Sequence, residues 1–345
     1  MTVRVSLDAT AVPARPVGAG RYVLELASAL SKRDDVDLVV VDKAPPFRPV
    51  RLAWEQVRLP RLLRQLNVDV HHAPHYTMPE RARVPTVVTV HDMTFFDHPE
   101  WHERTKTPFF RRAIRVAAKK ADAIICVSSV TAGRLRARLA PSVPVHVIPH
   151  GVDHTRFHPH GQDAPPFQEP YVASLGTLEP RKDVPSLVAA FDRIAARHRD
   201  LLLVIAGLDG WGAKEVNEAI SGAKHRDRIR RAGYLADDAV PALLRHAAAV
   251  AYPSLDEGFG LPALEALACG APLVTTEGTA MAEVTGDAAV LVPPGDVDAL
   301  AQALEGLVTA GPDVDRLRRR GPEVAAEYTW GKSAAAHVEV YRSVG

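Results

Sequence analysis

Short apolar runs alternate with helical patterns along the whole chain, and this alternation restricts the fold more than any other feature. The first run, Val3–Leu7, leads into a loop with two glycines and then a helical pattern from about Tyr22 to Leu30. Consecutive strands joined by helices pair in parallel, because each helix carries the chain back along the sheet. The sequence therefore predicts an α/β protein built from parallel sheets wrapped by helices.

The expected strands form two series, which predicts two domains. The first series is Val3–Leu7, Leu38–Val41, Val68–His72, Thr86–Val90, Ala123–Val127 and Val145–Ile148. The second series is Tyr171–Leu175, Leu201–Ala206, Ile229–Ala232, Ala248–Tyr252, Pro272–Thr275 and Ala289–Val292. The stretch PHGVDHTRFH and the proline-rich run DAPPFQEP separate them. Since 345 residues exceed one typical core, we expect a first domain over residues 1–160 and a second over 161–330.

Composition indicates a soluble cytoplasmic protein. The only two cysteines, Cys126 and Cys269, lie in apolar runs and are expected to be buried thiols in a reducing compartment. The start MTVRVSLDAT lacks the apolar core of a signal peptide, and no apolar run approaches the length of a membrane span. Residues 1–160 carry 24 Lys and Arg against 15 Asp and Glu, whereas residues 161–345 carry 18 against 26. This asymmetry suggests different partners for the two halves.

The segment SLDEGFGLPALEALACG holds two glutamates, Glu257 and Glu265, eight residues apart. Pro262 suits the first turn of a helix, and Gly270 can end that helix in a left-handed conformation. The residues Phe259, Gly260 and Leu261 then lead into a helix N-terminus, where free N–H groups favour a phosphate. A phosphate-binding site between two separated carboxylates suits a nucleotide sugar.

This segment resembles the E-x7-E signature of retaining glycosyltransferases of family 4, which includes glycogen synthase and many bacterial mannosyltransferases. The resemblance implies the GT-B fold, with two Rossmann-like domains, an active site in the cleft between them, and a last helix (about 331–345) that completes the first domain. It further implies that Glu265 binds the ribose hydroxyls of the nucleotide. Glu257 is then expected to contact the hydroxyls of the donor sugar.

Two further motifs fit a diphosphate. GTLEPRKD follows an expected strand, so Arg181 and Lys182 would lie at its carboxyl end, where open parallel sheets bind ligands. In the family, the matching pair binds the donor pyrophosphate. PVGAGRY follows the first strand, and Gly18 and Gly20 permit close approach of backbone to phosphate. The resemblance assigns this loop to the donor phosphates, and it places the loop that holds Tyr234 beside the nucleotide base.

His91, in TVHDMTFF, follows the strand Thr86–Val90. The resemblance implies that it contacts the transferred sugar and takes part in turnover. We expect no metal and no separate cofactor: two other histidine clusters lack cysteine partners, and neither H-E-x-x-H nor D-x-D occurs.

The basic stretch 104–121 combines apolar residues with many lysines and arginines. We favour a helix packed on the sheet with a solvated charged face. Peripheral contact with an anionic membrane, on the inner face of the cell membrane, is the open alternative. Nucleic-acid binding is not expected, because the basic half lacks a repeating pattern of interleaved aromatic residues.

These residues predict transfer of a hexose from a nucleoside diphosphate sugar to a glycan or lipid-linked acceptor, with retention of configuration and no covalent intermediate. Arg181, Lys182 and the backbone amides would stabilise the leaving diphosphate. The motif combination favours an α-mannosyl group from GDP-mannose, and UDP-sugars stay open. A nucleotide-sugar epimerase of the same fold is the alternative. A dehydrogenase would need a third glycine where Val23 stands.

Overall fold

The computed structural model describes residues 2–345, and the chain divides into two compact units. The first unit joins the chain up to Gly151 with Thr329–Gly345, and the second unit is Val152–Tyr328. The chain thus changes unit earlier than residue 160, where the sequence places the division. The C-terminal helix α14 (Trp330–Val344) belongs to the first unit.

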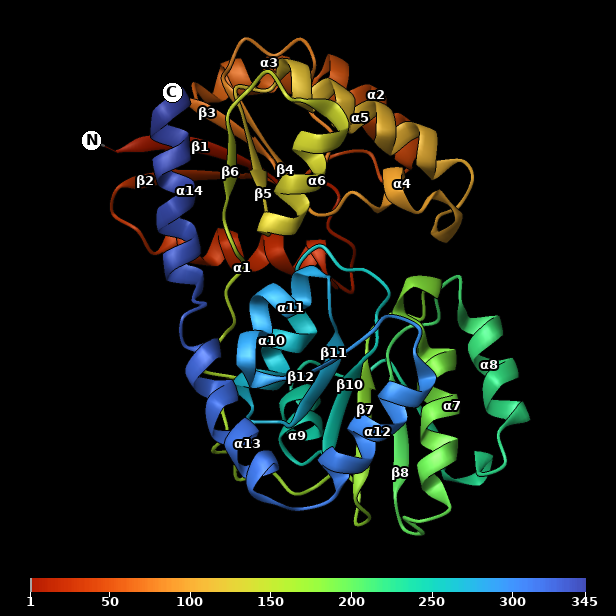
Figure 1. Cartoon of the computed structure of the whole chain (residues 1–345). Helices are drawn as coiled ribbons and strands as arrows, with labels where there is room; N and C mark the ends of the chain where they lie inside the picture. Colours follow the sequence, from red (N-terminus) through yellow and green to blue (C-terminus); the bar gives the residue numbers. More distant parts are fainter. Residues whose placement is uncertain (1) are drawn as a thin grey trace. The chain divides into compact units, whose positions relative to one another are not determined.

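The first unit contains a six-stranded parallel sheet in the order β2-β1-β3-β4-β5-β6. Its strands are β1 (Val3–Asp8), β2 (Val36–Val41), β3 (Val70–Ala73), β4 (Thr86–Val90), β5 (Ala123–Cys126) and β6 (Val145–Val147). Its other helices are α1 (Ala19–Ser31), α2 (Arg48–Val57), α3 (Leu59–Leu66), α4 (Thr94–Asp97), α5 (Lys106–Lys120) and α6 (Ser129–Leu139), with a 3₁₀ turn at Pro99–Trp101. Helices α1 and α14 pack together on one face, and α2, α3 and α5 lie on the other (Figure 1).

The second unit contains a six-stranded parallel sheet in the order β12-β11-β10-β7-β8-β9. Its strands are β7 (Tyr171–Leu175), β8 (Leu202–Ala206), β9 (Ile229–Gly233), β10 (Ala249–Tyr252), β11 (Leu273–Thr276) and β12 (Val290–Val292). Its helices are α7 (Val184–Ala195), α8 (Ala213–Gly222), α9 (Ala239–Arg245), α10 (Leu261–Ala268), α11 (Ala280–Thr285), α12 (Val297–Val308) and α13 (Pro312–Ala325). Short 3₁₀ turns occur at Pro180–Lys182, Arg226–Arg228 and Gly286–Ala288. Helices α7, α8 and α12 lie on one side of the sheet, and α10, α11 and α13 on the other (Figure 1).

Every strand expected from the sequence is present, within two residues of its expected ends, and both sheets are parallel as predicted. Central strands such as β4 and β8 are buried along their whole length, which explains their unbroken runs of apolar and β-branched residues. One expectation was wrong. Helix α1 begins at Ala19 rather than near Tyr22, so Gly20 lies in its first turn and only Gly18, with φ of 49°, precedes it.

The expected basic stretch forms helix α5. The apolar face of this helix is buried inside the first unit, so it cannot insert into a membrane. Phe110, Ile114, Ala117 and Ala118 are buried in the core of the first unit against β4 and β5. Arg112 and Lys120 both pair with Glu80, at 2.6 and 3.1 Å. The favoured interpretation, a helix packed on the sheet, is therefore confirmed.

Helix α10 begins and ends as the sequence predicts. Pro262 stands in its first turn, where a missing N–H leaves no hydrogen bond unmade. At the other end Gly270 adopts φ of 69°, its N–H donates to the Leu267 carbonyl, and the Ala271 N–H donates to the Ala266 carbonyl. This pair of bonds is a Schellman motif, which satisfies carbonyls that the helix leaves open.

A chain of buried hydrogen bonds attaches α14 to the first sheet. It runs, with distances between 2.7 and 3.0 Å, through the Ser333 carbonyl and the side chains of His337, Tyr22, Thr89, His72 and Tyr341. Burial lowers the pKa of His337 to about 4 and lowers the pKa of His72 well below its usual 6.5. Both rings are therefore neutral in the folded protein at neutral pH.

Two smaller expectations concern cysteines and membrane spans. Cys126 and Cys269 are buried free thiols, as predicted. Among residues 2–345, no helix combines the length and the apolar character that crossing a bilayer requires.

The buried histidines predict acid sensitivity of the first unit. Their pKa values are depressed in the folded state, so the unfolded chain binds protons more readily below pH 6.5. Stability is then fully present above pH 6.5 and falls as pH drops toward 4, by on the order of 2 kcal/mol for His337 alone at pH 5. Denaturant unfolding at pH 7.5 and pH 5 measures the loss. His337→Gln should flatten the pH profile, and the exposed control His160→Gln should not; equal slopes would contradict this account.

Helix α10 also predicts the effect of a methyl group at its N-cap. Gly260 has φ of 95°, and a Cβ there would meet Met281 Cγ at 2.5 Å. Gly260→Ala should therefore lower the free energy of unfolding by on the order of 2 kcal/mol, from left-handed strain plus the clash. Gly306→Ala in α12, which meets nothing within 4 Å, should be neutral or stabilising. Calorimetry measures the unfolding temperature of both variants. Similar unfolding temperatures for Gly260→Ala and Gly306→Ala would contradict the expected strain at Gly260.

Candidate functional site

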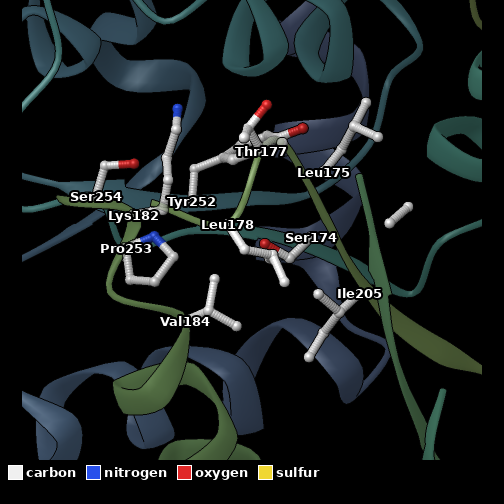
Figure 2. A pocket seen from close by; sticks show the side chains of 12 residues that line it. Ser174, Leu175, Thr177, Leu178, Lys182, Val184, Ile205, Tyr252, Pro253 and Ser254 are labelled. Atoms are coloured by element: carbon white, nitrogen blue, oxygen red, sulfur yellow. The ribbon is translucent and has the colours of Figure 1, made fainter. Parts of the chain in front are cut away.

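The candidate site lies where the connections of the second sheet change direction. Strands β7 and β10 are neighbours, and the chain leads from β7 to β8 on one side and from β10 to β11 on the other. Open parallel sheets bind ligands at the carboxyl ends of the strands at this switch point. A pocket lies there (Figure 2). Its lining includes Gly176, Thr177, Lys182, Tyr252 and Ser254.

Arg181 and Lys182 reach this position from the short 3₁₀ turn Pro180–Lys182 that follows β7. Asp183 then adopts φ of 47°, a left-handed conformation that aspartate tolerates better than most residues, and α7 begins at the next residue. The Leu255 N–H donates to the Arg181 carbonyl at 2.8 Å, which fixes this turn to the loop after β10. The two cations are therefore held at the strand ends, as predicted.

Glu257 lies between these two cations. Its Oε2 is 2.5 Å from Arg181 Nη1, and its Oε1 pairs with Lys182 Nζ. Burial alone would raise the pKa of this carboxyl, but the charges of Arg181 and Lys182 outweigh burial and lower the pKa to about 2. Glu257 is 8% exposed, so a buried carboxylate lies between two half-buried cations.

Sequence reasoning missed two members of this cluster. Glu179 Oε2 accepts from Arg181 Nε at 2.8 Å, and Ser254 Oγ donates to Glu257 Oε1 at 3.3 Å. Figure 2 shows Ser254 near Lys182 at the strand ends. Both residues lie inside the motifs GTLEPRKD and SLDEGFG, so proximity in the sequence was the signal that could have found them.

The entry to α10 follows Glu257 directly. Phe259 is buried, with its ring 6.1 Å from Tyr328, and Leu261 is the first residue of the helix. Glu265 lies further along α10 and is 8% exposed. Burial, followed by the charges of Glu265, Cys269 and Glu257, raises the pKa of the buried Tyr252 well above 10.

The other predicted residues lie elsewhere. Tyr234 follows the edge strand β9 and is 38% exposed. In the first unit, Gly18 precedes α1 and Gly20 lies within it, where a Cβ would meet Pro13 Cδ at 3.1 Å. Gly20 therefore allows the loop before α1 to approach the helix closely, whatever its role toward a ligand.

His91 stands at the end of β4 in the first unit. Its Nε2 donates to the Pro74 carbonyl at 2.8 Å, which leaves Nδ1 as the acceptor nitrogen. Its ring meets Tyr22 edge-on at 5.2 Å and Tyr76 at 5.6 Å. Burial lowers its pKa, so the imidazole is neutral at pH 7.

Within residues 2–345, no three His, Cys, Asp or Glu side chains gather in a geometry that could hold a metal ion. The cations of the described site are protein side chains, which are suited to bind an anion.

Two family models match the chain. The model of group 1 glycosyl transferases matches residues 160–324, and the model of glycosyltransferase family 4 matches residues 16–156. The chain is 27% identical over 306 residues to the O-antigen chain mannosyltransferase B of Escherichia coli, covering 86% of this chain and 78% of that protein. It is 33% identical over 229 residues to the MMP alpha-(1->4)-mannosyltransferase of Mycolicibacterium hassiacum, covering 65% and 54%.

Solved structures share the fold. Sucrose-phosphate synthase of Thermosynechococcus elongatus has a TM-score of 0.83 at 19% identity, over 99% of this chain and 98% of that one. Anabaena HepE, solved with UDP and glucose, has a TM-score of 0.80 at 18% identity, over 99% and 100%. These likenesses establish two Rossmann-like domains of the GT-B type. The two family models, which match residues 16–156 and 160–324, and the curated relatives show that the chain belongs to the glycosyltransferases of family 4 and is an enzyme that transfers sugars.

Proposed function

We propose that this glycosyltransferase moves an α-mannosyl group from GDP-mannose to a glycan or glycolipid acceptor, with retention of the anomeric configuration. The observation that carries the proposal is the cluster of Arg181, Lys182 and Glu257 at the switch point of the second sheet. The two cations of this cluster can bind a diphosphate, and its carboxylate can bind sugar hydroxyls.

The first requirement of the reaction is stabilisation of the leaving group. Breaking the anomeric bond leaves negative charge on the β-phosphate and positive charge on the sugar. Arg181 offers a rigid fork of donors and Lys182 a compact charge, and both are half-buried, where electrostatic stabilisation exceeds that in water. We therefore assign the neutralisation of the diphosphate to these side chains and to the amides before α10, without a metal ion.

The second requirement is orientation of the donor. Glu257 pairs with both cations, so a diphosphate must compete with its carboxylate for them. Once displaced, the Glu257 carboxylate is free to accept from the sugar hydroxyls and to favour the cationic transition state. Glu265, on the next turns of α10, is assigned to the ribose, and Tyr234 to the base.

The choice of mannose and of a glycan acceptor is supported by the relatives. Two of them are named as mannosyltransferases, and one of these acts on an O-antigen chain. HepE has been solved with UDP and with UDP-glucose, so a UDP-sugar donor is the second candidate. An epimerase of the same fold is the third, and it would release nucleotide and sugar without an acceptor.

Three assignments stay predictions. His91 is assigned to the transferred sugar, with its neutral ring and free acceptor nitrogen suited to a hydroxyl. Gly18 and Gly20 are assigned to the donor phosphates. Membrane contact through residues 104–121 would have to rest on the charged face of α5, because its apolar face is buried.

A thermal-shift series tests the donor. GDP and GDP-mannose should raise the unfolding midpoint at concentrations where UDP, UDP-glucose and NAD do not, because ligands that bind the folded state stabilise it by mass action. Stabilisation by UDP and UDP-glucose alone would move the donor to the second candidate. Stabilisation by NAD alone would contradict the transferase assignment of this site.

Substituting the two glutamates separates their roles. Glu257→Gln removes the anion that competes for Arg181 and Lys182, so affinity for GDP should hold or rise while turnover falls by at least about 100-fold. The same change removes the carboxylate between two half-buried cations and should lower the free energy of unfolding by on the order of 2 kcal/mol in the absence of a nucleotide. Glu265→Gln should instead weaken GDP binding about tenfold. Calorimetric titration and initial rates measure both effects, and equal loss of GDP affinity in the two variants would contradict the division of roles.

A further inference from the structure

We propose that the helices α2 and α3 form a surface that binds an anionic lipid bilayer. The exposed apolar side chains of α2 enter the boundary between headgroups and acyl chains, and the exposed arginines of α3 contact the lipid phosphates. This contact goes beyond the proposed function and depends on neither the donor nor the acceptor.

Helix α2 exposes an apolar stripe to solvent. Val50 and Val57 are seven residues apart, so they lie on one side of the helix. Phe47, the N-cap residue, stands three positions before Val50 and extends the same side. The exposed fraction is 67% for Phe47, 48% for Val50 and 58% for Val57. Three large apolar side chains exposed along one side of a helix indicate a contact surface.

The charged side chains of α2 face the protein instead. The Arg48 guanidinium lies over the Phe110 ring, 5.4 Å from its centroid, and Arg51 Nη1 donates to the Thr10 carbonyl at 3.1 Å. Glu55 is 8% exposed. A helix on the surface of a soluble protein normally turns its apolar side inward and its charges outward. Helix α2 does the reverse for these residues, which its role in the core of the unit does not explain.

Helix α3 continues this surface with a row of arginines. Arg58, Arg61 and Arg64 are spaced by three residues and are all exposed. Leu59 and Leu63 are buried on the opposite side of the helix, which fixes the direction of the row. Arg58 directly follows Val57 in the chain, so the row of arginines begins where the apolar stripe of α2 ends.

The loop before β4 adds positive charge beside α3. Ala82 and Val84 of this loop pack against the buried cluster that contains Leu59. Arg81 and Arg83, which alternate with these two residues, are exposed. The loop therefore places two further cations next to the arginines of α3.

Acidic side chains do not balance this charge. Residues 47–66 contain five arginines and a single acid, the buried Glu55. In the loop before β4, Glu80 already pairs with Arg112 and Lys120 of α5, at 2.6 and 3.1 Å. The surface thus combines an exposed apolar stripe with a net positive charge. Both features are needed for stable binding to a bilayer that contains anionic lipid.

Other occupants use only part of this surface. In a two-fold dimer the patch would meet its own copy, and the arginine rows would be brought together as like charges. A nucleic acid would bind the arginines through its phosphates and leave the apolar stripe exposed to water. A lipid surface satisfies both parts, because its phosphates lie directly above an apolar layer.

Co-sedimentation of the full chain with phosphatidylcholine vesicles, with and without phosphatidylglycerol, tests the surface. Binding at low salt should be at least about tenfold tighter when phosphatidylglycerol is present, and added salt should weaken it by screening. Phe47→Ser and Val57→Ser should each weaken binding about tenfold, because each removes an apolar side chain from the lipid. Arg61→Gln should weaken it about fivefold.

Two matched controls replace exposed side chains elsewhere. Leu24→Ser changes an exposed apolar residue of α1 in the same unit, and Arg199→Gln changes an exposed arginine of the second unit. Both should bind the vesicles as tightly as the unchanged protein. GDP binding, measured on the same samples, shows that the variants are folded.

Three outcomes would overturn the proposal. One is equal binding to the neutral and the anionic vesicles, and a second is an equal effect of Phe47→Ser and Leu24→Ser. A third is a duplex oligonucleotide that displaces the protein from the vesicles and binds Phe47→Ser undiminished, which would assign the arginines to nucleic acid. The vesicles carry neither nucleotide nor glycan, so a failure to bind them leaves the proposed function untouched. Vesicle binding without any nucleotide binding would contradict the proposed function and leave this surface standing.

Discussion

The contact between one buried carboxylate and two cations at the ends of β7 and β10 is the interaction on which the proposed function depends. Taking three charges out of water is expensive, and a pair of apolar residues would stabilise a sheet edge at lower cost. The cluster of Arg181, Lys182 and Glu257 is therefore better explained by binding than by stability. In the proposed function the pairing holds the two cations in place for a leaving diphosphate, which is the preorganisation that electrostatic catalysis requires.

The two units share a parallel-sheet topology but differ in the charged and titratable side chains they bury. Each unit has a parallel sheet whose connections change direction at one point. In the second unit the cations Arg181 and Lys182 are paired with Glu257. Neutral buried histidines also distinguish the first unit, because burial lowers the pKa of His75, His91 and His337 alike.

Much of the fold could be predicted from the sequence, because local patterns carry the necessary information. Apolar runs located the strands, and Pro262 with Gly270 located the ends of α10. Arg181, Lys182 and Glu257 were found as separate motifs, but their direct pairing joins residues 75 positions apart and depends on how β7 and β10 pack. The start of α1 at Ala19 was missed because glycine suggested a loop, whereas the close approach of Pro13 to Gly20 makes glycine useful inside the helix.

The most direct measurement of the central claim is a crystal structure of the protein with GDP. The account predicts that the phosphates lie within hydrogen-bonding distance of Arg181 and Lys182, and that Glu257 has released at least one of them. A nucleotide bound elsewhere, with both ion pairs of Glu257 unchanged, would contradict it.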